Sequence, residues 1–529
     1  MSGTAVLRRD YRWGALGVVA AGGIGVSSVL YPVPTVAGAT VVCSFVYALM
    51  LRRYLPGMFL VTLAILLLGY ASLGRGFAYL GMAPVYVGEM TLAFGLVATA
   101  LSGQVLQVFR SPVAWLIVAL SGWCALQTIP YVPQYGVDAL RDAAEWGYGV
   151  FALMVAACML VQPRWEQLLG WFRRCMPYLL VWTPLAWIIV RGADDLLPVL
   201  PGTDVKLVVF NHALVSVHLA GAAAFTLLGF GVSPSGQAQR RRPFIKWLLV
   251  SSWTLSFLIV ASITRSGLLA VATAVVVVGL FRPLVTARKL VTAGAIAAST
   301  LVLAPALFVG NLASDSRAYE DARRISLSQI GANFGSIVGK DQDDLTGTRT
   351  WRLEWWRTIV GYTLFGDYFW TGKGFGISLA EDDGFETTTS EDRPNRSPHN
   401  GHLTILARSG VPGAALWTLL HVGFAISLIR SYFRARLARN EKYARLAVWV
   451  LAYWSAFIVQ SSFDVFLEGP PGGISFWTVC GLGITIALQT QRLRRAEPRA
   501  VDHHGTATNA ADLVRQADRH AKTDRGWFH

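Results

Sequence analysis

The sequence predicts an all-α, polytopic membrane protein. Of its 529 residues, 54% are apolar and 15% are charged, and the mean hydropathy is +0.46. Soluble domains of ordinary composition carry about 25% charged residues. The apolar residues gather in runs close to the roughly 20 residues that a helix needs to cross a bilayer. We therefore predict a bundle of about 14 transmembrane helices and one long, partly helical loop outside the membrane.

The apolar runs form a long N-terminal group and a short C-terminal group. The first run has no small-residue cleavage site and is followed by another run, which favours a retained helix over a removed signal peptide. We expect transmembrane helices in 1–309, a long loop in 310–402, further transmembrane helices in 403–490 and a disordered tail in 491–529. The expected helices lie near 14–30, 33–51, 56–73, 86–109, 112–129, 146–162, 175–190, 206–230, 246–263, 267–281, 290–309, 403–429, 446–462 and 474–490.

The basic residues point to membrane topology and away from nucleic acid. The net charge is +15, but the Lys and Arg residues cluster between apolar runs, as in the segments 240–242 and 430–445. Short cytoplasmic connections of membrane proteins carry this excess of positive charge. We therefore expect both termini in the cytoplasm, the 310–402 loop outside, and no nucleic-acid partner. The short connections on the outer side would then hold only Arg75, Arg141, Arg191, Lys206 and Arg265.

Neither the cysteines nor the glycines suggest a metal or nucleotide site. The five cysteines lie in or beside apolar segments without Cys-x-x-Cys spacing, so we expect neither a zinc site nor a disulfide framework. Gly372, Gly374 and Gly376 resemble a glycine-rich phosphate loop, but they lack the strand before it and the Lys-Ser/Thr after it. We predict a tight turn there and no cofactor.

The loop 310–402 is the only long one, and loops of this length usually have structure and purpose. We expect helices at about 317–335 and 348–362. In the second helix, the i, i+3, i+7 spacing puts Arg349, Arg352 and Trp356 on one face, and Trp351 and Trp355 share another. These tryptophans either lie in the lipid interface, as an aromatic belt does, or have a role beside the arginines.

The segment 396–403 reads Arg-Ser-Pro-His-Asn-Gly-His-Leu where the loop turns back into an apolar run. A histidine flanked by arginine and asparagine at such a turn is a candidate general base. A loop histidine is also commonly a simple surface residue. On the sequence alone both interpretations of His399 stand.

Several short motifs together resemble the O-antigen ligase and polymerase superfamily over about residues 70 to 485. The motifs occur in the family's order around one long outer loop between late helices. They are Gly74 to Gly81, Arg141 to Ala144, Thr264-Arg265-Ser266-Gly267, Trp351 to Trp356, Thr371 to Gly376, Arg396 to Asn400 and Ala407 to Gly413.

This resemblance implies a GT-C-like glycosyltransferase in the bacterial cytoplasmic membrane. It would move a glycan from a polyprenyl (undecaprenyl) diphosphate to an acceptor sugar hydroxyl at the outer face, by one inverting step and without a metal or other cofactor. Arg265 and Arg352 match the family's arginines, and a guanidinium group suits a diphosphate. Arg349 and Arg396 are secondary candidates for the diphosphate.

The resemblance also implies that His399 is the base that accepts the acceptor's proton, and Asn400 would orient this histidine or a sugar. The expected partners are the lipid-linked glycan donor, a glycan, lipid-anchored or cell-wall acceptor, and membrane lipids. Ligase and polymerase share this chemistry and differ in the acceptor, which the sequence does not disclose.

Two other interpretations remain open. In the first, Arg265 anchors the end of its helix at the lipid headgroups. A secondary transporter or flippase also has many spans, but such proteins tend to show internal repeats and charges near the bilayer midplane. We find no repeat, and the arginines of interest lie at helix ends and in one outer loop. The enzyme is therefore the favoured interpretation.

Overall fold

The computed structural model describes a helical bundle. The described residues are 52, 54–82, 85–161, 163–231, 243–282, 287–289, 291, 294, 343–386 and 395–496. Within them the only strands are β1 (Gly81–Met82) and β2 (Val85–Tyr86), which pair antiparallel in one short hairpin. The all-α class predicted from composition is confirmed.

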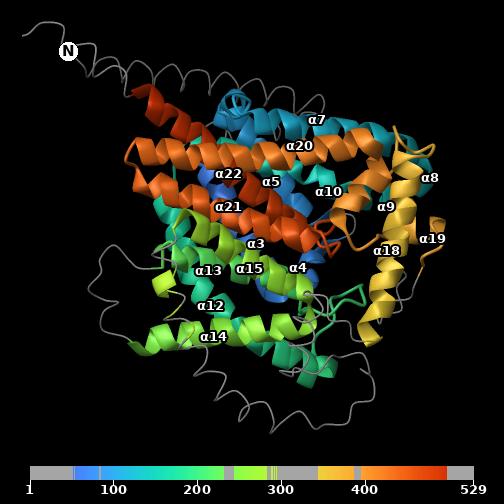
Figure 1. Cartoon of the computed structure of the whole chain (residues 1–529), viewed down its shortest axis with the longest axis horizontal. Helices are drawn as coiled ribbons and strands as arrows, with labels where there is room; N and C mark the ends of the chain where they lie inside the picture. Colours follow the sequence, from blue (N-terminus) through green and yellow to red (C-terminus); the bar gives the residue numbers. More distant parts are fainter. Residues whose placement is uncertain are drawn as a thin grey trace, which may run out of the picture.

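Three late helices form the centre of the bundle. They are α20 (Gly401–Leu437), α21 (Glu441–Ser461) and α22 (Pro470–Ala496), which pack on one another and lie side by side in Figure 1. Every residue in the most apolar stretch of α22 is buried. A glycine allows α22 to pack closely on α11 (Gly149–Val161) as well, because a Cβ on Gly481 would lie 2.6 Å from the Ala152 carbonyl oxygen.

Earlier helices surround this centre on two sides. On one side α3, α5, α7 and α11 pack against α20 and α22 or against each other, and on the other side α13 and α15 pack against α21. Their bounds are α3 (Leu55–Leu73), α5 (Val87–Ser102), α6 (Val105–Val108), α7 (Pro112–Thr128), α11 (Gly149–Val161), α12 (Trp165–Gly192), α13 (His212–Leu227), α14 (Pro243–Ile263) and α15 (Arg265–Phe281).

The remaining elements lie in the connections. Four short pieces join α7 to α11, and α18 crosses one end of the bundle (Figure 1). The bounds are α4 (Arg75–Ala78), η1 (Ile129–Tyr131), α8 (Val132–Tyr135), α9 (Val137–Asp142), α10 (Ala144–Gly147), η2 (Asp194–Leu196), α18 (Asp343–Leu364) and α19 (Leu379–Asp382).

Eleven of the fourteen predicted runs fall on helices, and 14–30, 33–51 and nearly all of 290–309 lie outside the described residues. In the described part, six helices are long and apolar enough to span a membrane, and a bent pair formed by 137–147 and 149–161 makes a seventh candidate. Four more apolar helices are shorter, such as α13 with 16 residues. At 1.5 Å per residue such a helix reaches about 24 Å, less than the roughly 30 Å of bilayer hydrocarbon.

The predicted loop helix at 348–362 is confirmed as α18, whereas the one at 317–335 and the tail from 497 onward lie outside the described residues. The described part of the loop has a small core of its own against the start of α20. This core comprises Trp355, Ile359, Leu379, Ala380, Leu406 and Ala407. The first turns of α20 therefore pack as part of the loop.

Candidate functional site

Helix α20 consists of two helices joined at Gly410. Gly410 has φ 67° and ψ −171°, a conformation that only glycine adopts easily. The first part, 401–410, folds back along the second, because Trp417 Nε1 donates a hydrogen bond to His402 Nδ1 at 2.9 Å. The other ring nitrogen of His402 lies 3.1 Å from Ser462 Oγ at the end of α21. The residues before Gly401 are therefore held beside the end of α21.

Asn400 begins the folded-back helix as its N-cap. Its Oδ1 accepts hydrogen bonds from the backbone N–H groups of His402 and Leu403 at 3.0 and 3.2 Å, as asparagine often does at this position. His399 directly before it has φ 52°, which is uncommon for a residue other than glycine and often marks functional sites. The Asn400 side chain is thus occupied in fixing the backbone next to His399.

Helix α18 lies over His399 and holds it in place. Trp356 Nε1 donates a hydrogen bond to the Pro398 carbonyl oxygen at 2.8 Å, and the Trp351 ring lies 6.4 Å from the His399 ring, centroid to centroid. Trp355 is fully buried and donates to Asp383 Oδ2 at 2.6 Å. The predicted grouping is observed, since the Trp351 and Trp355 rings are 5.2 Å apart. These tryptophans therefore pack against other parts of the loop or form hydrogen bonds with them.

His399 lies between a positive and a negative group. Burial lowers the pKa of the His399 imidazole, the nearby Arg352 guanidinium lowers it further, and Asp464 opposes this with its negative charge. Arg352 Nη1 donates a long hydrogen bond of 3.5 Å to the Phe463 carbonyl oxygen. Burial and Arg352 thus favour the neutral imidazole, which is the form that accepts a proton.

Arg265 is the first residue of α15, after the N-cap Thr264, and is half-buried. It lies at the same end of the bundle as His399. Two contacts show this: a Cβ on Gly267 would lie 3.0 Å from the Ser216 Cβ of α13, and His212, one turn earlier in α13, has Nε2 at 3.8 Å from Asp464 Oδ2. Arg349 lies one turn before Arg352 in α18, and its side chain is outside the described part.

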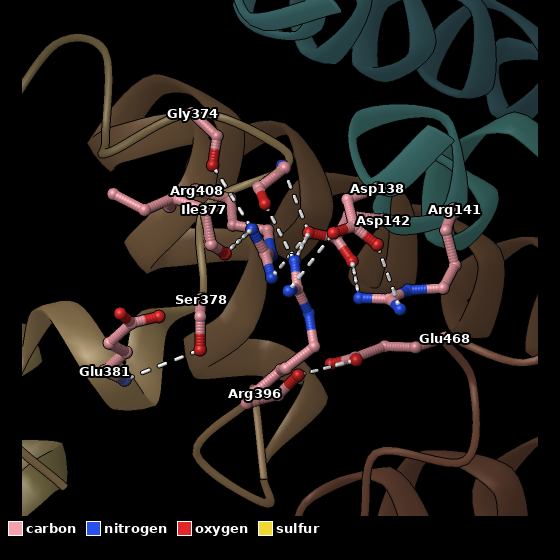
Figure 2. Close-up of polar contacts among 12 residues, drawn as sticks. Asp138, Arg141, Asp142, Gly374, Ile377, Ser378, Glu381, Arg396, Arg408 and Glu468 are labelled. Atoms are coloured by element: carbon pink, nitrogen blue, oxygen red, sulfur yellow. Dashed lines mark hydrogen bonds and ion pairs between the residues drawn. The ribbon is translucent and has the colours of Figure 1, made fainter. Parts of the chain in front are cut away.

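Arg396 points into a second cluster, built around Asp142 of α9 (Figure 2). Its Nη2 lies 3.3 Å from Asp142 Oδ2 and donates to the Gly376 carbonyl oxygen at 2.7 Å. The buried Arg408 of α20 lies 3.0 Å from the same carboxylate oxygen and donates to the carbonyl oxygens of Gly374 and Ile377. Arg396 and Arg408 thus fasten α9 and the 372–377 turn to the segment 395–400 and to α20.

The glycine-rich segment forms the tight turn that the sequence predicts. Gly372, Gly374 and Gly376 all have positive φ, at 64°, 82° and 109°. Lys373 between them binds the carboxylates of Asp382 and Asp383. Burial alone would lower the pKa of the Lys373 ammonium, but these two carboxylates raise it. Asp382 and Asp383 therefore hold Lys373, and with it the turn, in place.

Sequence reasoning missed Asp464, Glu468, Glu145 and the role of Arg408. Arg408 carried a usable signal, because a charged residue inside an apolar run is usually functional or paired. Asp464 and Glu468 lie in the short connection between α21 and α22 and showed no pattern. Among the described residues no three His, Cys, Asp or Glu side chains are grouped as metal ligands would be.

These features define a class of protein: a polytopic helical membrane protein in which a loop helix, a folded-back helix and the bundle end enclose a histidine beside arginine. The comparison with known families is more specific. Residues 250–418 match the family model described as O-antigen ligase, a span that includes Arg265, Arg352 and His399. This match confirms the resemblance to the O-antigen ligase and polymerase superfamily over that span. No curated protein matches the chain significantly.

Proposed function

We propose that the chain is a polyprenyl-diphosphate-dependent glycosyltransferase of the bacterial cytoplasmic membrane. It transfers a glycan to an acceptor sugar hydroxyl at the outer face of that membrane, as an O-antigen ligase does. The observation that carries the proposal is the placement of His399, a buried imidazole near the Arg352 guanidinium at the end of the bundle. The family match over 250–418 supports the same chemistry.

In this reaction His399 acts as the general base. Its imidazole accepts the proton of the acceptor hydroxyl while that oxygen forms a bond to the anomeric carbon of the donor sugar. The bond from this carbon to the diphosphate oxygen breaks, and the lipid diphosphate leaves with the electron pair. One such displacement inverts the anomeric configuration.

Arg352 and Arg265 bind the donor diphosphate in this proposal. Guanidinium groups stay protonated and offer planar pairs of donors to phosphate oxygens, and positive charge at the leaving group stabilises the transition state. Arg349 joins them from one turn earlier in α18. In this proposal Arg396 and Asn400 support the site from outside the reacting groups, because their side chains hold Asp142 and the start of α20.

The acceptor distinguishes a ligase from a polymerase. A ligase would use a lipid-anchored or cell-wall glycan, and a repeat-unit polymerase would use the growing polymer. The site of His399 and the arginines serves both, because each reaction requires the same displacement at the donor.

The proposal is tested with purified full-length protein reconstituted with a defined undecaprenyl-diphosphate oligosaccharide and candidate glycan acceptors. Wild type should transfer the glycan, and His399→Ala should reduce the rate by at least about a hundredfold, since general bases contribute about 10²–10⁴-fold. His503→Ala, in the tail beyond the described residues, is the control and should transfer like wild type. Undiminished transfer by His399→Ala at wild-type membrane levels would exclude this histidine as the base.

A further inference from the structure

Two glutamates lie behind the segment 395–400, at the N-terminus of the folded-back helix. Glu145 of α10 is 1% exposed, and its Oε1 lies 3.5 Å from where a Cβ on Gly401 would be. Glu468, from the connection between α21 and α22, accepts a hydrogen bond from Ser397 Oγ at 2.6 Å. The two side chains therefore adjoin Ser397 and Gly401, which lie two positions before and after His399.

The carboxyl groups are poorly supplied with donors. Neither oxygen of Glu145 has a hydrogen-bond partner, and neither does Oε1 of Glu468. An ionised carboxylate buried without donors is costly in free energy, and the group usually keeps its proton instead. Burial likewise raises the pKa of the Glu468 carboxyl group, against the opposing effects of Arg408 and the Ser397 hydroxyl.

The charges that face the pair do not neutralise two carboxylates. Glu145 is faced by Glu468, by Arg408 from α20, by Asp142 from α9 and by Cys124 from α7. Glu468 is faced by Arg408 and Asp142, and by the hydroxyl groups of Ser397 and Thr404. Arg408 already forms an ion pair with Asp142 at 3.0 Å. The surrounding charges therefore stabilise one negative charge on Glu145 and Glu468 together and oppose a second.

We propose that Glu145 and Glu468 share one proton and act as positioning residues that hold the start of α20, and with it His399, in its working place. Glu145 is the acid of the pair, because the Ser397 hydroxyl already donates to Glu468. The single negative charge that remains suits the positive end of the 401–410 helix. This inference rests on the proposed function only for the role of His399.

The shared proton predicts a direction of pH dependence. The pair is held together while it keeps its proton and comes apart as the pH rises far enough to remove it, because two adjacent carboxylates repel each other. Transfer should therefore fall on the alkaline side. In Glu145→Gln the amide donates in place of the acid and does not titrate. The pH at which transfer declines on the alkaline side should therefore rise by about one pH unit or more.

The first test does not involve catalysis. Infrared spectra of the full-length protein, recorded across a pH titration, report the carbonyl stretch of protonated carboxyl groups. Wild type should show a band near neutral pH that disappears at alkaline pH, and both Glu145→Gln and Glu468→Gln should lack it. Glu381→Gln, at an exposed position of α19, should keep it. A band that persists in both variants would overturn the shared proton, whatever the protein catalyses.

The second test measures glycan transfer against pH in the reconstituted system. Glu145→Leu, which leaves Glu468 without its partner, should lower transfer at neutral pH by about a hundredfold, the cost of a displaced catalytic group. Glu145→Gln should lower it far less and shift the alkaline limb. Equal pH profiles for wild type and Glu145→Gln would overturn the positioning role. A wild type inactive with every donor would refute the proposed function alone, and the infrared result would still decide the inference.

Discussion

At the scale of single residues, the charge state of the His399 imidazole depends on its burial and on two charged neighbours. Burial and Arg352 favour the neutral form, and Asp464 partly offsets them. The φ of 52° at His399 costs free energy that the adjacent cap and the Trp356 hydrogen bond compensate. A surface histidine needs none of these contacts, so the geometry favours the base over the simple surface residue.

The charge of Asp464 should be visible in the acid limb of activity. Because Asp464 raises the pKa of His399, Asp464→Asn should lower that pKa. Less imidazole is then protonated at a given acidic pH, and the acid limb of transfer moves to lower pH. The measurement is the pH dependence of transfer, together with the histidine ring signals in NMR. Glu354→Gln, on an exposed part of α18, is the control, and an upward shift in Asp464→Asn would contradict the prediction.

At the scale of elements, the break in α20 fixes the position of the site. The 401–410 helix folds back so that His402 lies beside Ser462, at the end of α21. The 372–374 turn closes over the break, because Lys373 N and Gly374 N donate to the carbonyl oxygens of Ala407 and Arg408. Loop and helix thus form one unit around Gly410.

Gly410→Ala should therefore disrupt this unit. A Cβ there would lie 2.6 Å from the Phe369 carbonyl oxygen and 2.9 Å from Gly372 N, and φ would remain at 67°. We expect a loss of about 2 kcal/mol or more in the free energy of unfolding, the scale of such backbone strain, and a matching loss of transfer. Thermal unfolding in detergent measures the first quantity.

Gly122→Ala in α7 is the matched control for this substitution. A Cβ at Gly122 meets nothing within 4 Å, and alanine favours a helix over glycine by about 1 kcal/mol. This variant should be as stable as wild type or more so. If Gly410→Ala melts like Gly122→Ala, the break in α20 is not a constraint on the fold.

At the scale of the whole molecule, the apolar runs predicted the helices well because a bilayer demands length and apolarity, and both are local properties of sequence. They did not predict the break at Gly410, since residues 403–429 read as one continuous run. Arg396 was expected at the diphosphate and Asn400 at the histidine or a sugar, but a motif gives the identity of a side chain without its direction, and these two turn toward Asp142 and the backbone of α20. Glu145 and Glu468 come from separate connections, and only the fold brings them together.

The orientation of the molecule is the prediction on which the outer-face chemistry depends. Asp367 and Arg439 are exposed near opposite ends of the second part of α20: Val411 N donates to the carbonyl oxygen of Phe369, and α20 ends at Leu437. The segment 411–437 is about 40 Å long at 1.5 Å per residue, enough to separate the two membrane surfaces. The basic cluster 430–445 predicts that Arg439 is cytoplasmic.

Single cysteines in a variant without the five native ones test this orientation. Asp367→Cys should react with a membrane-impermeant maleimide on cells whose cytoplasmic membrane is intact, and Arg439→Cys should react only after that membrane is permeabilised. Labelling after permeabilisation is the control that both cysteines are reactive. The reverse pattern would place His399 and Arg352 on the cytoplasmic side. It would therefore exclude them as the base and the diphosphate ligand for transfer at the outer face.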